Sequence, residues 1–163
     1  MPVSAIETDF PILAPIMERL VPTQTNTALL VAAAMSAAAS VLHLGCIIGG
    51  ASWYRFFGAG ERMARSAEAG SWYPAFVTLC IALVLAIWAA YALAGAGVIQ
   101  RPPLLKAGLC AITAIYLLRG VVIVPALLLP RGPATSFAIW SSAICLAIGL
   151  VHAVGLAQVW AKL

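Results

Sequence analysis

Four long runs of apolar residues, separated by short polar or proline-containing stretches, dominate the pattern along this chain. The runs cover about residues 27–49, 74–98, 104–128 and 136–160. Each exceeds the roughly 20 residues that a helix needs to cross the hydrocarbon core of a bilayer. The pattern therefore predicts an all-α integral membrane protein, a single domain over residues 1–163 that crosses the membrane four times.

The connections between the runs predict how the helices are arranged. Residues 99–103 and 129–135 are short and contain prolines, so the helices that they join are expected to be antiparallel neighbours. We therefore expect a four-helix bundle with up-down topology. The connection at residues 50–73 is longer, and Glu61 to Glu68 within it forms a predicted short helix that ends near Gly70.

The short helix predicted at 61–68 is expected to lie along the membrane surface. Glu61 and Arg65 are four residues apart with the acid first, the order that favours an ion pair on a helix. Residues 1–24 mix apolar residues with acids and prolines, so we expect a second interfacial segment there and no secretory signal. Aromatic residues bracket the short helix as they do in interfacial belts: Trp53, Tyr54, Trp72 and Tyr73.

The composition agrees with a membrane protein. Hydrophobic residues make up 64% of the chain and charged residues 9%, and the mean hydropathy is +1.06. Soluble domains have about 25% charged residues, which cover their apolar core. The net charge of +4 comes from scattered Lys and Arg with no basic stripe, so we expect membrane lipids and no nucleic acid as partners.

The basic residues of the loops and the small residues of the helices bear on membrane orientation and oligomeric state. The expected loops on the two sides carry equal numbers of basic residues: Arg19, Arg101, Lys106 and Lys162 on the side of the termini, and Arg55, Arg62, Arg65 and Arg131 on the other. We expect a bacterial inner membrane with cytoplasmic termini, the commoner arrangement for an even number of spans. Small residues, including Gly45 and Gly49, predict close helix packing within the bundle or between copies in a homo-oligomer.

Polar residues inside the apolar runs predict a binding site. Arg119 is the most informative, because an Arg at the centre of a membrane helix costs about 2.5–3.5 kcal/mol on insertion scales. At about 1.5 Å per residue, His43 and Arg119 lie roughly 24 and 22 Å from the face that carries the termini. Arg119 is expected to extend to the nearer surface, to turn towards Tyr116, Glu61 or the carbonyl of Val121, or to bind a ligand. Other polar residues share this half of the membrane: Thr78, Ser141 and Ser142.

A second polar layer is expected nearer the termini. It contains Ser36, Tyr91, Thr113 and His152. Spacings of four and three residues place Ser36, Ser40 and His43 on one face of their helix. The same spacing places Thr113, Tyr116 and Arg119 on one face of theirs. We expect these polar faces to meet inside the bundle.

No cofactor or metal site is expected. The two histidines, His43 and His152, differ in depth by roughly 12 Å, so they are poorly placed to bind one haem iron or to share a metal ion. The cysteines form no C-x-x-C pair and fall in four different runs, where small apolar packing is the expected role. They are Cys46, Cys80, Cys110 and Cys145.

Three functions remain open from the sequence. The leading hypothesis is binding or translocation of a small polar, anionic or lipid-headgroup ligand by His43, Arg119 and Tyr116, with Glu61 and Arg65 at the entrance. The second is a membrane-embedded enzyme that acts on a lipid or isoprenoid, with His43 or Glu61 as its acid–base group. The third is a structural or assembly subunit of a membrane complex, whose polar faces only hold the helices together.

Overall fold

The computed structural model describes residues 25–122 and 136–163, and these residues are helical with no strand. The all-α prediction is confirmed. The segment predicted at 1–24 and the turn predicted at 129–135 lie outside the described residues. The described α-helices are α2 (Thr27–Phe56), α3 (Glu61–Glu68), α4 (Tyr73–Gly95), α5 (Leu105–Val121) and α7 (Ser136–Val159), and a 3-10 turn, η2 (Trp160–Lys162), follows α7.

Three described stretches of helix are long and apolar enough to cross a membrane. They are Thr27–Phe56, Tyr73–Gly95 and Phe137–Lys162, and they match the first, second and fourth predicted spans. α5 begins where the third span was predicted and is 17 residues long. The rest of that predicted span lies outside the described residues. The chain is therefore compatible with a multi-pass membrane protein.

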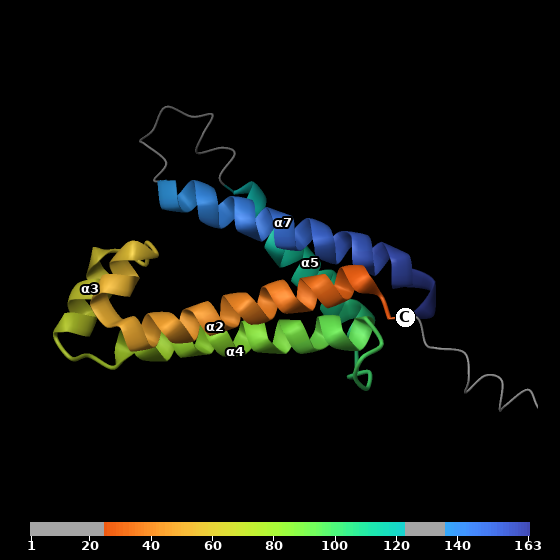
Figure 1. Ribbon diagram of the computed structural model, residues 1–163, viewed down its shortest axis with the longest axis horizontal. Coiled ribbons are helices and arrows are strands. Elements are labelled where there is room, and N and C mark those ends of the chain that lie inside the picture. Colours follow the sequence, from red (N-terminus) through yellow and green to blue (C-terminus); the bar gives the residue numbers. More distant parts are fainter. Residues whose placement is uncertain (1–24, 123–135) are drawn as a thin grey trace, which may run out of the picture.

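The long helices associate mainly as two pairs (Figure 1). α2 and α4 lie side by side along the long axis of the molecule, α5 packs on α7, and α2 also contacts α7. α3 lies at the end of the molecule where α2 ends and α4 begins, and the C-terminus lies at the opposite end.

Asn26 joins three helices at the end opposite α3. Its Oδ1 accepts a hydrogen bond from the Leu29 N–H at 2.8 Å, which caps the start of α2. Its Nδ2 donates to Gln158 of α7 at 2.8 Å, and its backbone N–H donates to the Ala96 carbonyl, just after α4, at 3.1 Å. The start of α2 is thereby fixed beside the ends of α4 and α7.

Glycines bring α5 and α7 into close contact. A Cβ on Gly120 of α5 would lie 2.7 Å from the backbone of Leu146, and one on Gly149 of α7 would lie 2.9 Å from the backbone nitrogen of Leu117. Such approach is open only to residues without a side chain. These two contacts fix α5 against α7 and set which polar residues of the two helices face each other.

Gly50 changes the direction of the first long helix. Its φ of 61° and ψ of −145° are not helical, and α2 continues beyond it to Phe56. The first helical segment of α2 therefore ends at residue 49, as predicted, and a second segment of α2 follows Gly50. Glycine reaches this conformation without the penalty of a side chain. Beyond the bend, the Trp53 ring lies against Gly45 and Gly49 of the same helix. The glycine face that we expected to pack on another helix is thus covered by Trp53.

The short helix predicted between the first two spans is confirmed as α3, Glu61–Glu68. It buries Ala64 in a small cluster with Cys46 and Tyr54. Tyr54, expected in an interfacial aromatic belt, is instead buried, with 3% of its surface exposed. Its hydroxyl accepts a hydrogen bond from Thr78 of α4 at 3.3 Å, because the bend at Gly50 turns this side chain inward.

Candidate functional site

Arg119, in the last turn of α5, contacts two hydroxyls on α7. Its Nη1 donates to the Ser142 Oγ at 3.1 Å and its Nη2 to the Ser141 Oγ at 3.0 Å. Ser142 is buried and Arg119 is exposed at the surface of the protein. We call these three residues the Arg119 site. The guanidinium therefore lies along the α5–α7 interface, held by neutral groups.

The Arg119 site contains no carboxylate among the described residues. Every ion pair in the described part of the chain involves Arg55 or Arg65 with Glu61 or Glu68, near α3. A guanidinium presents five N–H donors and a full positive charge. Hydroxyl oxygens satisfy part of that hydrogen-bonding capacity but carry no compensating charge. None of the described residues therefore neutralises the positive charge of Arg119.

A second group of predicted residues meets in the core, further along the same two helices. The Tyr116 hydroxyl of α5 lies 3.0 Å from the Ser36 hydroxyl of α2. Its ring packs edge-on against Trp88, with centroids 4.9 Å apart, and lies 5.3 Å from the ring of His152 on α7. Tyr116, Ser36 and His152 are all buried. The expected meeting of polar faces is therefore observed here, across three helices.

His152 is fully buried, and only one of its two ring nitrogens has a described hydrogen-bond partner. Its Nδ1 lies 3.0 Å from the Ile148 carbonyl, which only accepts, so Nδ1 carries the proton. Its Nε2 is then an acceptor, and it has no hydrogen-bond partner among the described residues. His43 of α2 has the same local arrangement, with Nδ1 2.7 Å from the Ala39 carbonyl. His43 and Arg119 were predicted to lie at nearly the same depth in the membrane. They form no described hydrogen bond with each other.

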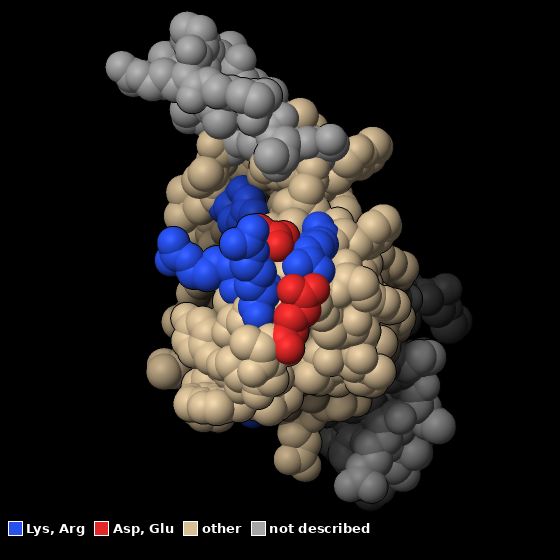
Figure 2. Space-filling model, turned by 90° about the vertical axis from the view of Figure 1, so that its left-hand side faces the viewer, with Lys and Arg blue, Asp and Glu red and all other residues tan. Residues whose placement is uncertain are grey.

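Glu61 and Arg65 belong to a different part of the molecule. Arg55, at the end of α2, donates to Glu61 at 2.9 Å and to Glu68 at 2.6 Å, and Arg65 donates to Glu61 at 3.1 Å. The predicted Glu61–Arg65 pair is confirmed. We call these four residues the Arg55 cluster, and Figure 2 shows acidic and basic side chains interleaved at this end of the molecule.

The Arg55 cluster keeps its acids ionised. The hydrogen bond from Arg55, with that from Arg65, lowers the pKa of Glu61 to about 2. The hydrogen bond from Arg55 lowers the pKa of Glu68 as well. Exposed ion pairs contribute little to overall stability. Their main consequence is to hold α3 beside the end of α2.

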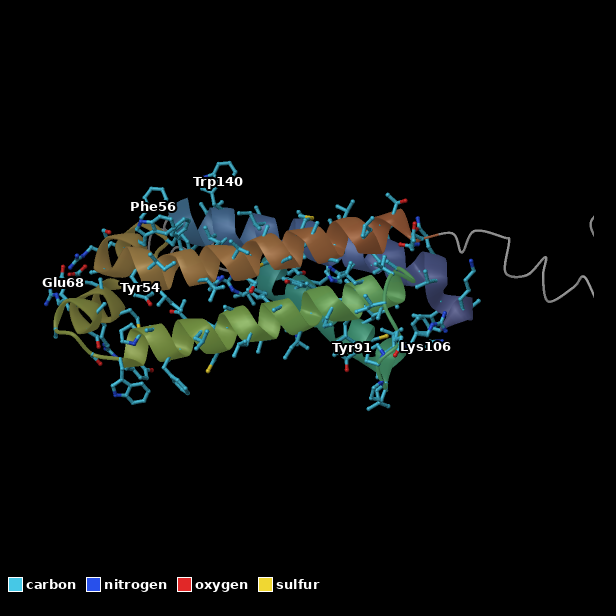
Figure 3. All side chains as sticks on the ribbon, turned by 60° about the horizontal axis from the view of Figure 1, so that its bottom comes forward. Tyr54, Phe56, Glu68, Tyr91, Lys106 and Trp140 are labelled. Carbon is cyan, nitrogen blue, oxygen red and sulfur yellow. The ribbon has the colours of Figure 1, made fainter. Side chains whose placement is uncertain are left out.

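Two further predicted residues form no described hydrogen bond with either polar group. Thr113 donates to the Leu109 carbonyl of its own helix at 2.7 Å. Tyr91 lies at the end of the molecule near Lys106, as Figure 3 shows. Its hydroxyl donates to the Pro103 carbonyl at 3.5 Å, and its ring covers Gly108. The expected second layer is therefore reduced to Ser36 and His152, with Tyr116 added.

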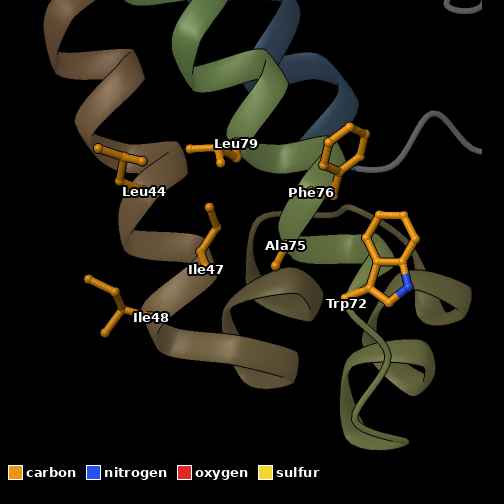
Figure 4. Close-up of a pocket in the computed structure, with 7 residues that line it drawn as sticks. All are labelled: Leu44, Ile47, Ile48, Trp72, Ala75, Phe76 and Leu79. Atoms are coloured by element: carbon orange, nitrogen blue, oxygen red, sulfur yellow. The ribbon is translucent and has the colours of Figure 1, made fainter.

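An apolar groove of about 530 Å³ lies on α2 and α4, near α3 (Figure 4). It contains no charged side chain, and it lies away from the α5–α7 interface. Its walls suit a hydrocarbon chain, but they offer nothing to orient a polar ligand. The lining residues are Leu44, Ile47, Ile48, Trp72, Ala75, Phe76 and Leu79.

Sequence reasoning did not find the partners of Arg119. Ser141 and Ser142 had the right depth, but they were not identified as ligands of the guanidinium. A pair of adjacent serines in an otherwise apolar helix was the available signal.

Among the described residues, no three His, Cys, Asp or Glu side chains lie close enough together to hold a metal ion.

No protein-family model matches this chain, and no curated protein or solved structure matches it either. Function must therefore be argued from the site itself.

Proposed function

We propose that this chain is a multi-pass membrane protein that binds or translocates a small polar or anionic ligand, such as a lipid headgroup, at the Arg119 site. The observation that carries the proposal is a guanidinium held by two neutral hydroxyls with no carboxylate among the described residues. A charged side chain within a membrane span is costly unless it is paired. An anion at this position would neutralise Arg119 and use its remaining N–H donors.

The proposed architecture is an antiparallel four-helix bundle of α2, α4, α5 and α7. Contacts at both ends of α5 and α7 support it, because Lys106 donates to the Trp160 carbonyl at one end and Arg119 contacts Ser142 at the other. The 17 residues of α5 extend about 25 Å, close to the thickness of a hydrocarbon core. We propose that α3 lies at the membrane surface. As the setting we propose a bacterial inner membrane with cytoplasmic termini.

Binding of inorganic phosphate to the detergent-solubilised protein tests the function. Isothermal titration should give binding heat for the unaltered protein and for Arg101→Gln, a matched control. Arg101 is an exposed cation at the other end, where it donates to the Lys162 carbonyl. Arg119→Gln should lose the binding heat. Equal binding by Arg119→Gln would remove the proposed function.

A structural or assembly subunit is the second candidate, favoured by the satisfied hydroxyls of the core. Ser36 pairs with Tyr116, Ser40 donates to the Ala82 carbonyl of α4 at 2.7 Å, and Thr78 donates to Tyr54. These bonds serve helix packing alone. Co-purification with a larger membrane complex, together with absence of any ligand at Arg119, would favour this candidate.

The membrane-enzyme hypothesis gains no support from the described residues. Glu61, its candidate acid, is paired with Arg55 and Arg65, and its pKa of about 2 keeps it a carboxylate near neutral pH. His43, the other candidate, contacts a carbonyl of its own helix.

A further inference from the structure

We propose that the ligand of the Arg119 site is an anionic phospholipid that enters sideways from the bilayer. Its phosphate would bind the guanidinium and the two serine hydroxyls, and its acyl chains would lie along the exposed surface of α5 and α7. This inference rests on the proposed function and specifies the ligand of the same site.

The donors of the site suit a phosphate group. Both serine oxygens accept a hydrogen bond from Arg119, and within residues 25–122 and 136–163 neither hydroxyl is recorded as donating one, so each has a proton to offer a ligand. The site thus offers spare guanidinium N–H groups and two O–H donors. A phosphate has several charged acceptor oxygens, and Arg is well matched to them because its planar fork forms paired hydrogen bonds.

Exposed apolar side chains lie beside this site on the outer surface of α5 and α7. Ile115 lies one helical turn before Arg119, and Ile144 one turn after Ser141. Since the two helices run in opposite directions, both isoleucines lie on the same side of the polar site. They are 48% and 54% exposed. A polar site beside exposed apolar side chains fits a molecule that has a charged head and hydrocarbon chains.

The charge balance favours an anionic headgroup over a zwitterionic one. A zwitterionic lipid brings its own ammonium group, which would need a carboxylate nearby. Among the described residues the carboxylates of Glu61 and Glu68 are engaged by Arg55. Arg119, Ser141 and Ser142 provide a positive charge and hydrogen-bond donors, and no described residue adds a negative charge to them.

Native mass spectrometry of the intact chain in a neutral detergent tests the inference. The probes are dioleoyl phosphatidylglycerol and dioleoyl phosphatidylcholine. We expect the anionic lipid to bind about fivefold or more tightly than the zwitterionic lipid, because both carry the phosphate and only the zwitterionic lipid adds an ammonium group that Arg119 repels. Arg119→Gln should abolish this preference, and Arg101→Gln should keep it. Equal binding of the two lipids by the unaltered protein would overturn the inference.

The chain path is tested separately. Ile115→Ala with Ile144→Ala should weaken phosphatidylglycerol binding about threefold or more, because apolar contact area is lost, while phosphate binding stays unchanged. The matched control is Leu83→Ala with Ile87→Ala on the exposed face of α4, where each residue is 55% exposed. It should leave both affinities unchanged. Equal loss in the two double variants would overturn the path.

The outcomes separate this inference from the function on which it rests. Phosphate binding that depends on Arg119, without a preference for phosphatidylglycerol, would overturn the lipid inference and leave the proposed function standing. If neither phosphate binding nor the preference for phosphatidylglycerol depends on Arg119, the lipid inference and the proposed function are both overturned.

Should Arg119→Gln fail to fold, Ser141→Ala with Ser142→Ala keeps the cation and removes two donors. This pair should weaken phosphatidylglycerol binding about fivefold or more, and an unchanged affinity would overturn the inference.

Discussion

The hydroxyl of Ser36 on α2 lies 3.0 Å from the hydroxyl of Tyr116 on α5, and both side chains are buried. This bond joins the two main helix pairs at the level where His152 of α7 packs on the Tyr116 ring. The hydrogen bond thus links α2 to α5, and the ring contact adds α7 to the same part of the core.

Removal of both hydroxyls of this pair should destabilise the protein by less than the sum of the two single removals. Ser36→Ala or Tyr116→Phe leaves a buried hydroxyl without its partner, at a cost of about 1–3 kcal/mol. The double variant leaves two apolar groups in contact, so its loss should be smaller than the sum of the single losses. Denaturation of the detergent-solubilised protein measures the cycle. Strict additivity would show that the two hydroxyls do not interact.

A methyl group added at Gly149 or Gly120 should disturb the α5–α7 interface. The new Cβ would lie within 2.9 Å of the facing backbone. Overpacking of this kind costs about 1–3 kcal/mol, at roughly 2–4 °C per kcal/mol for a chain of this size. Thermal melting of Gly149→Ala and Gly120→Ala, compared with Ala147→Val on the exposed face of α7 as control, checks this. Melting temperatures unchanged in all three variants would contradict the packing.

Acid should release α3 from the rest of the molecule. The pKa of Glu61 is lowered from 4.5 to about 2, and that of Glu68 is also lowered. The stabilisation from a lowered pKa is present above pH 4.5 and is lost as the pH falls towards 2. Hydrogen exchange of the α3 amides, corrected for intrinsic rates, should therefore accelerate over this range.

The matched variant for the acid effect is Glu61→Gln with Glu68→Gln. It lacks the titrating groups, so exchange in α3 should be fast and independent of pH. Persistence of the acid-induced change in this variant would assign it to other groups.

Four crossings should place α3 and the C-terminus on opposite sides of the membrane. With the native cysteines replaced by Ala, Arg62→Cys in α3 and Lys162→Cys near the end of the chain provide single labelling sites. A maleimide that cannot cross the bilayer should label them from opposite sides of sealed vesicles. Labelling from the same side would require an even number of crossings between them and would contradict the three crossings by α4, α5 and α7.

Much of the fold was predictable, because membrane helices are recognised in a sequence by their length and apolar composition. The short helix from Glu61 to Glu68 was also predictable, since its acid–base spacing and the following Gly70 are local signals. The end of the first helical segment at residue 49 was predicted as well. The helical segment that follows the bend at Gly50 was not, because these residues were interpreted as part of the connection between two spans. The same bend buries Tyr54, which composition alone would place at an interface.

The sequence predicted how deep in the membrane the candidate site lies, but it did not predict which residues contact each other there. Arg119 and Ser142 share a level that residue counting can estimate. The rotation of each helix decides which residues meet, and it depends on the backbone contacts of Gly120 and Gly149. These contacts direct Arg119 towards α7, and His43 contacts its own helix instead. Tyr116 was expected beside Arg119, yet its hydroxyl lies beside Ser36 of α2, the helix that also packs on α7.

The most direct test of the account is an electron cryo-microscopy map of the protein in phosphatidylglycerol nanodiscs. We predict non-protein density of phosphate size within hydrogen-bonding distance of the Arg119 guanidinium and the hydroxyls of Ser141 and Ser142, with extended density continuing past Ile115 and Ile144. A guanidinium that contacts only protein groups, with no such density beside it, would contradict the account.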